Sequence, residues 1–454
     1  MRTATLRANA TSRASGTPLS DFGNQSRAGD SKLLRVVGFW SLAAAIVNVT
    51  IGGSIFALPG TLAASMGAAA PLAFIFGAFL FVPIVVCFAA VGSRVTVTGG
   101  PYSYVDAAFG RFPGFAIAAI FWISNVAGSG GLAAILADQL SHPFPWLGQP
   151  VPRALFLLAM YSALVGLNAR GIRIGAAAIV AFAVAKALPL TLLAIVGIRY
   201  VRIDNLRVPE APSWTSIGSS LVMVVFAYSG IETALAPSGE VRNSASVVPK
   251  AAFVGVGVVI ALYVGLQVVA QGALGPALAG NDAPLAALAD LIIPAGGALL
   301  VLTAVVSLIG CIQGELMGSS RLLFALARDG YLPAPLARVS DRHRAPVGAL
   351  IAHALVAWAL ATAGSFTTLA LVSGGAFCFV YIGVCAAAWR LAQTLEGGSD
   401  ATPRLRGGAL IPVIGIVGLV VILATLERRE WVAIGSATLA VCLLYVATGK
   451  ARGR

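Results

Sequence analysis

The sequence predicts an all-α polytopic membrane protein with about twelve transmembrane helices. The 454-residue chain is 58% hydrophobic and only 10% charged, and its mean hydropathy is +0.91. Water-soluble domains of this size do not approach these values, because about a quarter of their residues are charged. Apolar runs of about 20 residues, the length that spans a bilayer as a helix, also recur along the chain.

Each predicted span corresponds to one apolar run, and polar segments separate the runs. The first five lie near residues 35–59, 69–92, 110–136, 152–168 and 175–198, and the next five near 214–237, 247–271, 291–327, 346–363 and 368–390. Two further spans are predicted near 408–426 and 430–448. The eighth run is long enough to continue past the membrane as a helix.

The basic residues indicate how the chain is oriented. The formal net charge is +13, but Lys and Arg lie in short segments between apolar runs, so they indicate topology and no nucleic-acid partner. Most lie on the side that holds both termini, although the loop 199–213, with three arginines, disagrees locally. The positive-inside rule therefore predicts a multi-pass protein of the cell membrane with cytoplasmic tails, a disordered one at 1–33 and a short one at 449–454.

The cysteines predict neither a disulfide framework nor a metal site. All five lie inside apolar runs and none forms a CxxC pair: Cys87, Cys311, Cys378, Cys385 and Cys442. No metal and no cofactor are expected, and the oligomeric state stays open.

Two of the predicted spans carry helix-weakening residues at mid-depth. The first contains "VNVTIGGSIFALPG" (47–60), with Gly52, Gly53 and Ser54, and the sixth contains "FAYSGIETALAPSG" (226–239), with Ser229 and Gly230. The sixth span comes five spans after the first, so the second half of the chain enters the membrane from the opposite side. This pattern is typical of inverted-repeat transporters and predicts repeats at 34–200 and 213–390, followed by a pair of helices at 408–448.

Interrupted membrane helices favour a binding site, because unpaired backbone groups in hydrocarbon are costly unless they line a cavity or meet a ligand. Amide groups at the start of the second half-helix can hold a carboxylate, and carbonyls at the end of the first can accept bonds from an ammonium. An amino acid zwitterion fits both. The alternative interpretation is that the glycines only permit close helix packing.

Three ionisable residues lie inside predicted spans: Lys186, Glu232 and Glu315. Each needs a partner, a water-filled cavity or a change of protonation to be tolerated there. Lys186 could take up and release a proton, or act as a fixed cation, or form a permanent structural pair. Glu232 and Glu315 could take part in gating or in a polar network, and Glu232 could equally be a packing acceptor.

Four strings resemble, in order and spacing, motifs of the amino acid-polyamine-organocation permeases. They are "TVTGGPYSYVDAAFG" (96–110), "FAYSGIE" (226–232), "GEVRNSASVVPKA" (239–251) and "SSRLLFALARDGYLP" (319–333). The resemblance runs from about residue 34 to 390 and more weakly to the end. It implies a LeuT-like fold of five plus five inverted helices with two more, and alternating access around a central site.

The resemblance also implies which residues bind substrate. The carboxylate maps to Gly52, Gly53, Ser54 and Ile55, and the ammonium to carbonyls near Ile51, Phe226, Ala227 and Ser229. The segment around the second break adds Tyr228, Gly230 and Ile231 to the expected site, and Phe226 is the expected gate. Lys186 falls where proton-using members often carry a lysine. Ser54 departs from the family, which commonly has glycine at that position.

The sequence thus predicts a proton-coupled, sodium-independent importer of neutral amino acids, with the amino acid, H⁺ and the lipid bilayer as its partners. Neutral side chains are expected because the spans around the presumed pocket offer no clear carboxylate for a cationic side chain, unless Glu315 reaches the pocket. The residues that these spans offer are Phe226, Ile231, Ile55, Trp122 and Ser124.

Three alternatives remain. The first is an amino acid or amine exchanger of the same fold. The second is an intramembrane hydrolase that uses Ser129 of "AGSGG" with His353, although no HExxH string or aspartate pair within the spans supports it. The third is a sensor that binds without transport.

Overall fold

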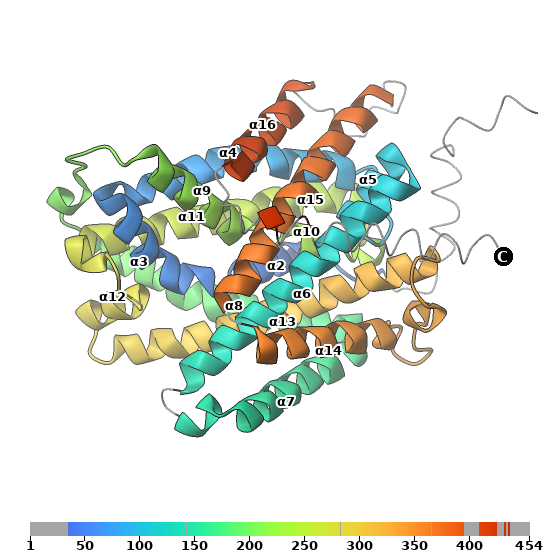
Figure 1. Ribbon diagram of the computed structural model, residues 1–454, viewed down its shortest axis with the longest axis horizontal. Helices are drawn as coiled ribbons and strands as arrows, with labels where there is room; N and C mark the ends of the chain where they lie inside the picture. Colours follow the sequence, from blue (N-terminus) through green and yellow to red (C-terminus); the bar gives the residue numbers. More distant parts are fainter. Residues whose placement is uncertain are drawn as a thin grey trace, which may run out of the picture.

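The structure is a computed structural model that describes residues 35–141, 144–281, 283–364, 366–394 and 408–424, with residues 431, 432 and 435. These residues form a helical bundle whose one β contact is an isolated bridge between Val37 and Val241. Among them, eight helical segments are long and apolar enough to cross a membrane, and three shorter apolar helices accompany them. The predicted all-α polytopic class is confirmed (Figure 1).

Both of the interrupted spans are broken helices. The first is divided into α2 (Phe39–Thr50) and α3 (Ser54–Met66), and the sixth into α9 (Trp214–Tyr228) and α10 (Ile231–Ala234). The chain leaves the helix at Ile51–Gly53 and at Ser229–Gly230, the positions that the glycines indicate.

The other predicted spans correspond to continuous helices. These are α4 (Ala70–Gly92), α6 (Arg111–Ser141), α7 (Pro150–Ala169), α8 (Ile172–Gly197), α11 (Ser244–Leu274), α13 (Gly296–Arg328), α14 (Val347–Ala363), α15 (Phe366–Thr394) and α16 (Leu410–Ala424). The span predicted at 430–448 and the tails predicted at 1–33 and 449–454 lie outside the described residues.

Two short helices were not predicted, α5 (Pro101–Phe109) and α12 (Pro284–Ile292). Each has nine residues and proline in its first turn, so neither is long enough to span a bilayer. The eighth predicted run began at residue 291, whereas α13 begins at Gly296. Ala295 has a φ of +61°, and this left-handed residue separates α12 from α13.

The two broken helices run in opposite directions. Near one end of the bundle, the Ser65 hydroxyl of α3 lies 3.0 Å from that of Ser220 in α9. Near the other end, the amides of Val36 and Val37, just before α2, donate to Glu240 O at 3.0 Å. We call these the Ser65 end and the Glu240 end. The first pair of half-helices therefore runs from the Glu240 end to the Ser65 end, and α9 and α10 run back.

Candidate functional site

Lys186 closes the first break from one side. Its side chain is fully buried, and Nζ donates to the carbonyls of Asn48 (2.9 Å), Ile51 (2.7 Å) and Ser307 (3.0 Å). An ammonium has three donors and no acceptor, so all its hydrogen-bonding capacity is used. Lys186 thus joins α8 to the carboxyl end of α2 and to α13.

The remaining carbonyls at the end of α2 also have protein partners. Thr50 O accepts from the Tyr263 hydroxyl at 2.9 Å, and Val49 O from the Cys311 thiol at 3.0 Å. The Ser307 hydroxyl lies 3.0 Å from the carbonyls of both Ile51 and Gly52. The last four carbonyls of a helix have no intrahelical partner. The carbonyls of Asn48, Val49 and Thr50, and that of Ile51 just after α2, each accept from a side-chain donor.

The start of α3 is different, because its amides are free. No described residue accepts a hydrogen bond from the backbone N–H groups of Gly53, Ser54 or Ile55, and the first amide with a partner is that of Phe56, which donates to Gly53 O at 3.2 Å. Since these donors coincide with the positive end of the α3 dipole, they form a site suited to a carboxylate.

Glu232 caps the second break. Its buried carboxylate accepts from the Gly230 amide at 2.8 Å and from the Tyr381 hydroxyl at 2.9 Å. One residue further, the Thr233 hydroxyl donates to Asn125 Oδ1 at 2.7 Å. The Glu232 carboxylate therefore has both oxygens engaged and anchors α10 to α15.

Gly230 brings the two breaks into direct contact. Its φ is +137°, and a Cβ at this position would lie 2.6 Å from Thr50 Oγ1 and 2.8 Å from Thr50 N. A residue with a side chain would be strained in this conformation and would also collide with the backbone of the first span. Glycine is required here for both reasons.

A cavity lies between the two breaks. Its lining comes from both interrupted spans and from α6, α13 and α15: Val49, Thr50, Gly52, Gly53, Ser54, Gly128, Leu132, Phe226, Ser229, Gly230, Glu232, Thr233, Cys311, Glu315, Ser373 and Phe377. A cavity at the junction of two broken helices is the place where secondary transporters of this architecture bind substrate.

The structure brings part of the predicted site to this cavity. Gly52, Gly53, Ser54, Phe226, Ser229 and Gly230 line it, as do Glu232 and Glu315. Ile51, Ile55, Ala227, Tyr228 and Ile231 are buried and do not line it, and neither do Trp122 and Ser124. Lys186 lies behind the wall, on the far side of the α2 carbonyls.

Tyr228 and Ser124 have structural contacts instead. The Tyr228 hydroxyl donates to Phe74 O at 3.0 Å, and the Ser124 hydroxyl to Ser373 O at 2.7 Å. Tyr228 and Ser124 do not line the cavity because successive residues of a helix point about 100° apart. When one of two neighbours faces the cavity, the other faces away from it.

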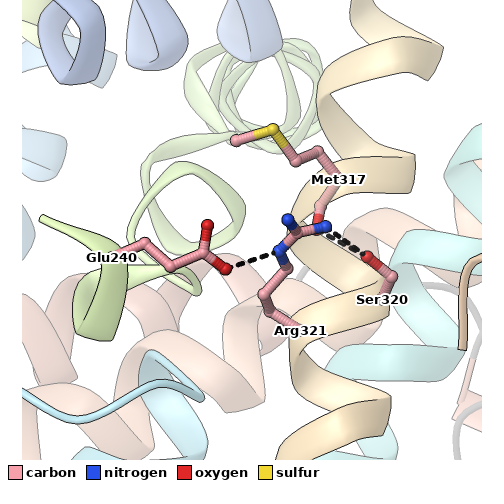
Figure 2. Close-up of polar contacts among 4 residues, drawn as sticks. All are labelled: Glu240, Met317, Ser320 and Arg321. Atoms are coloured by element: carbon pink, nitrogen blue, oxygen red, sulfur yellow. Dashed lines mark hydrogen bonds and ion pairs between the residues drawn. The ribbon is translucent and has the colours of Figure 1, made fainter. Parts of the chain in front are cut away.

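Sequence reasoning missed a buried ion pair near the Glu240 end. Arg321 Nε donates to Glu240 Oε1 at 2.9 Å, and both side chains are 1% exposed. Figure 2 shows the guanidinium between Glu240 and the Ser320 hydroxyl, which it approaches to 3.1 Å. Glu240 belongs to the 239–251 motif and Arg321 to the 319–333 motif. The opposite charges of Glu240 and Arg321, one in each motif, were the sequence signal from which this pair could have been predicted.

The hydrolase arrangement is absent. The Ser129 hydroxyl lies 3.1 Å from the Tyr161 hydroxyl, and neither ring nitrogen of His353 has a hydrogen-bond partner among the described residues. A serine nucleophile needs a base within hydrogen-bonding reach. Ser129 therefore has a structural contact and no activating histidine among the residues that the structure describes.

Comparison with known proteins identifies the family. The sequence profile described as "Amino acid permease" matches residues 37–446. The chain belongs to this family. It is a multi-pass membrane transporter of amino acids and not an enzyme.

Similar curated proteins include permeases and exchangers. The chain is 25% identical over 437 residues to the branched-chain amino acid permease BcaP of Lactococcus lactis, covering 89% of the chain and 92% of the relative. It is 24% identical to the serine/threonine exchanger SteT of Bacillus subtilis, covering 67% and 70%. It is 29% identical to an arginine/ornithine antiporter of Pseudomonas aeruginosa, covering 68% and 67%.

Proposed function

We propose that the protein is a sodium-independent, proton-coupled importer of amino acids that works by alternating access, with inverted repeats at 34–200 and 213–390. The position of Lys186 carries this proposal. Its ammonium occupies the space between the α2 and α13 carbonyls, where a bound metal cation would otherwise need those oxygens. A cation supplied by the chain removes the need for sodium.

The same contacts support the proposal of proton coupling. Loss of a proton from Lys186 would remove both the charge and one of the three donors that join α8 to α2 and α13. The contact between these helices would weaken, and the first span could then move. Protonation of Lys186 and closure of this contact are therefore coupled in the proposal.

The substrate's backbone groups are assigned to the cavity. The free amides of Gly53 and Ser54 are proposed to hold the carboxylate, and the break at Phe226–Ser229 to receive the ammonium. The carbonyls of Ile51 and Phe226, expected to contact the ammonium, already accept bonds from within the protein. A preference for neutral side chains draws support from the apolar wall of Leu132, Phe226 and Phe377.

Uptake into proteoliposomes tests the proposal. Purified protein in sodium-free buffer should accumulate labelled neutral amino acids when the pH gradient is directed inward, and should not accumulate them without it. No gradient-dependent uptake across a panel of the common amino acids would refute proton coupling.

Two lysine variants test the role of Lys186. Lys186→Ala should lose gradient-driven accumulation, whereas Lys250→Ala, which removes an exposed lysine of α11, should not. Unchanged accumulation by Lys186→Ala would exclude Lys186 as the coupling group. Whole cells test the orientation: antibodies should reach tags on both termini only after the cell membrane is permeabilised, as expected for cytoplasmic tails.

An exchanger is the second candidate. All three donors of Lys186 are engaged, as expected for a group that never deprotonates, and two of the similar proteins are named as an exchanger and an antiporter. Accumulation by liposomes that contain no internal substrate would exclude obligate exchange. Uptake that appears only after the liposomes are loaded with amino acid would support it.

A further inference from the structure

Among the described residues, Glu315 is the acidic residue of the cavity wall with a carboxylate oxygen that has no partner. The residue is 8% exposed, and its Oε2 is buried and has no hydrogen-bond partner among the described residues. The other acidic residue of the wall, Glu232, has both oxygens engaged by Gly230 and Tyr381. A buried polar atom without a partner is costly, which favours a partner brought by the ligand.

The buried cations of the described chain are engaged elsewhere. Lys186 donates its three protons to backbone carbonyls, and Arg321 pairs with Glu240. Neither forms a salt bridge with Glu315. The charge of Lys186 is near enough to act on Glu315, but neither cation donates a hydrogen bond to its Oε2.

The surroundings of Glu315 leave room for a ligand group. It lies on α13 opposite Gly128 of α6 and Ser373 of α15, and all three line the cavity. A Cβ on Gly128 would lie 3.1 Å from Ser373 Oγ and 3.5 Å from Glu315 Oε1, so a glycine at this position avoids crowding these two oxygens. Two side-chain oxygens thus converge on one small region of the wall.

We propose that Glu315, with Ser373, forms a side-chain subsite that binds a positively charged nitrogen, so that the transporter also takes amino acids with cationic side chains. The proposal rests on the proposed transport function and extends its substrate range. Carboxylate and hydroxyl oxygens are acceptors that match an ammonium, and a charged partner compensates a buried carboxylate better than a neutral one. An apolar side chain would leave Oε2 without a partner.

Competition with matched ligands tests the subsite. L-Lysine and L-ornithine are compared with L-norleucine, which has the lysine carbon chain without the terminal nitrogen, as inhibitors of neutral amino acid uptake by wild-type protein. Glu315→Gln should weaken inhibition by lysine and ornithine at least tenfold relative to norleucine, the range expected for loss of a charge-assisted hydrogen bond. Glu315→Asp should recover part of that ratio because it retains the charge.

Glu210→Gln is the matched control, since it removes the same charge from an exposed residue; the lysine-to-norleucine ratio should stay at the wild-type value. Thermal stability of Glu315→Gln with and without norleucine shows that the variant is folded and binds. Neutral uptake that neither lysine nor ornithine inhibits would overturn the subsite while leaving the proposed function in place. Equal inhibition of wild-type protein and Glu315→Gln would also overturn it.

Discussion

The buried pair of Arg321 and Glu240 gives the sharpest prediction for stability. The atoms lie 2.9 Å apart and both side chains are 1% exposed. At an effective dielectric constant of about 20 their attraction is about 6 kcal/mol, which the cost of burying both charges largely offsets. Removing one charge takes the ion-pair partner from the other, which stays buried, so Glu240→Gln or Arg321→Met alone should destabilise the protein by about 3–5 kcal/mol.

The double variant should recover most of that loss, because no unpaired charge remains. Thermal unfolding of the four proteins in one detergent, followed by intrinsic fluorescence, measures the cycle. As a control, Arg207→Met breaks an exposed pair with Asp204, whose side chains are 77% and 81% exposed, and should change stability by less than about 1 kcal/mol. A double variant whose loss equals the sum of the single losses would show that the pair does not act as a unit.

Three further predictions concern single positions. Gly230→Ala should abolish transport and lower stability by about 2–5 kcal/mol, because the positive φ and the contact with Thr50 both oppose a Cβ. Gly257→Ala, with no atom near its Cβ, should be tolerated. Equal behaviour of the two variants in unfolding and uptake would contradict this prediction. Burial raises the pKa of Asp106 to about 6, with a smaller contribution from a neighbouring carboxylate, and the difference from 3.8 corresponds to about 3 kcal/mol. Stability should therefore fall as pH rises from about 4 through 6, and Asp106→Asn should flatten this dependence; a stability that increases over this range in wild-type protein would exclude the assignment. Ser54→Gly should fold normally and shift the relative KM values of different amino acids in uptake assays, and loss of folding would show that Ser54 is a packing residue.

The spans and their breaks could be predicted from sequence because both depend on local composition. About 20 apolar residues are needed wherever a helix crosses hydrocarbon, and paired small residues weaken a helix wherever they occur. The predictions at Gly52, Gly53 and Gly230 therefore agree with the structure. The short helices α5 and α12 could not be found in this way, since neither is long enough to show as an apolar run.

The partners of polar residues could not be predicted, because they come from distant parts of the chain. Lys186 meets carbonyls 138 and 121 positions away, and Asn48 Nδ2 donates to Gly310 O across 262 positions. Membrane helices are apolar on all sides, so their sequences do not indicate which face a polar residue occupies. The same ambiguity explains why Ile55 and Ile231, expected at the substrate, are buried behind the cavity.

A single helix, α13, connects the substrate cavity to the Glu240 end. Four residues on it contact the two broken spans in turn. The Ser307 hydroxyl donates to Ile51 O just after α2, and the Cys311 thiol to Val49 O of α2. Gly318 packs on Thr233 of α10, and Arg321 pairs with Glu240. In the proposed alternating-access cycle, opening the Glu240 end would require α2 and α10 to separate from this one face. Gly318 makes that contact close, since a Cβ there would lie 2.4 Å from Thr233 O.

The contacts along α13 differ in how a ligand can act on them. The Arg321 pair is buried and remote from the cavity lining, so a substrate does not change it directly. The Lys186 and Ser307 contacts involve carbonyls beside the cavity wall. In the proposed mechanism, a change in protonation or an amino acid bound at Gly53 would alter the free energy that holds α2 to α13 there. A ligand shifts a conformational equilibrium only by its differential affinity for the two states. Lys186 variants should therefore change the coupling of transport to its driving gradient, whereas Arg321 variants should change the balance between open and closed states for all substrates alike.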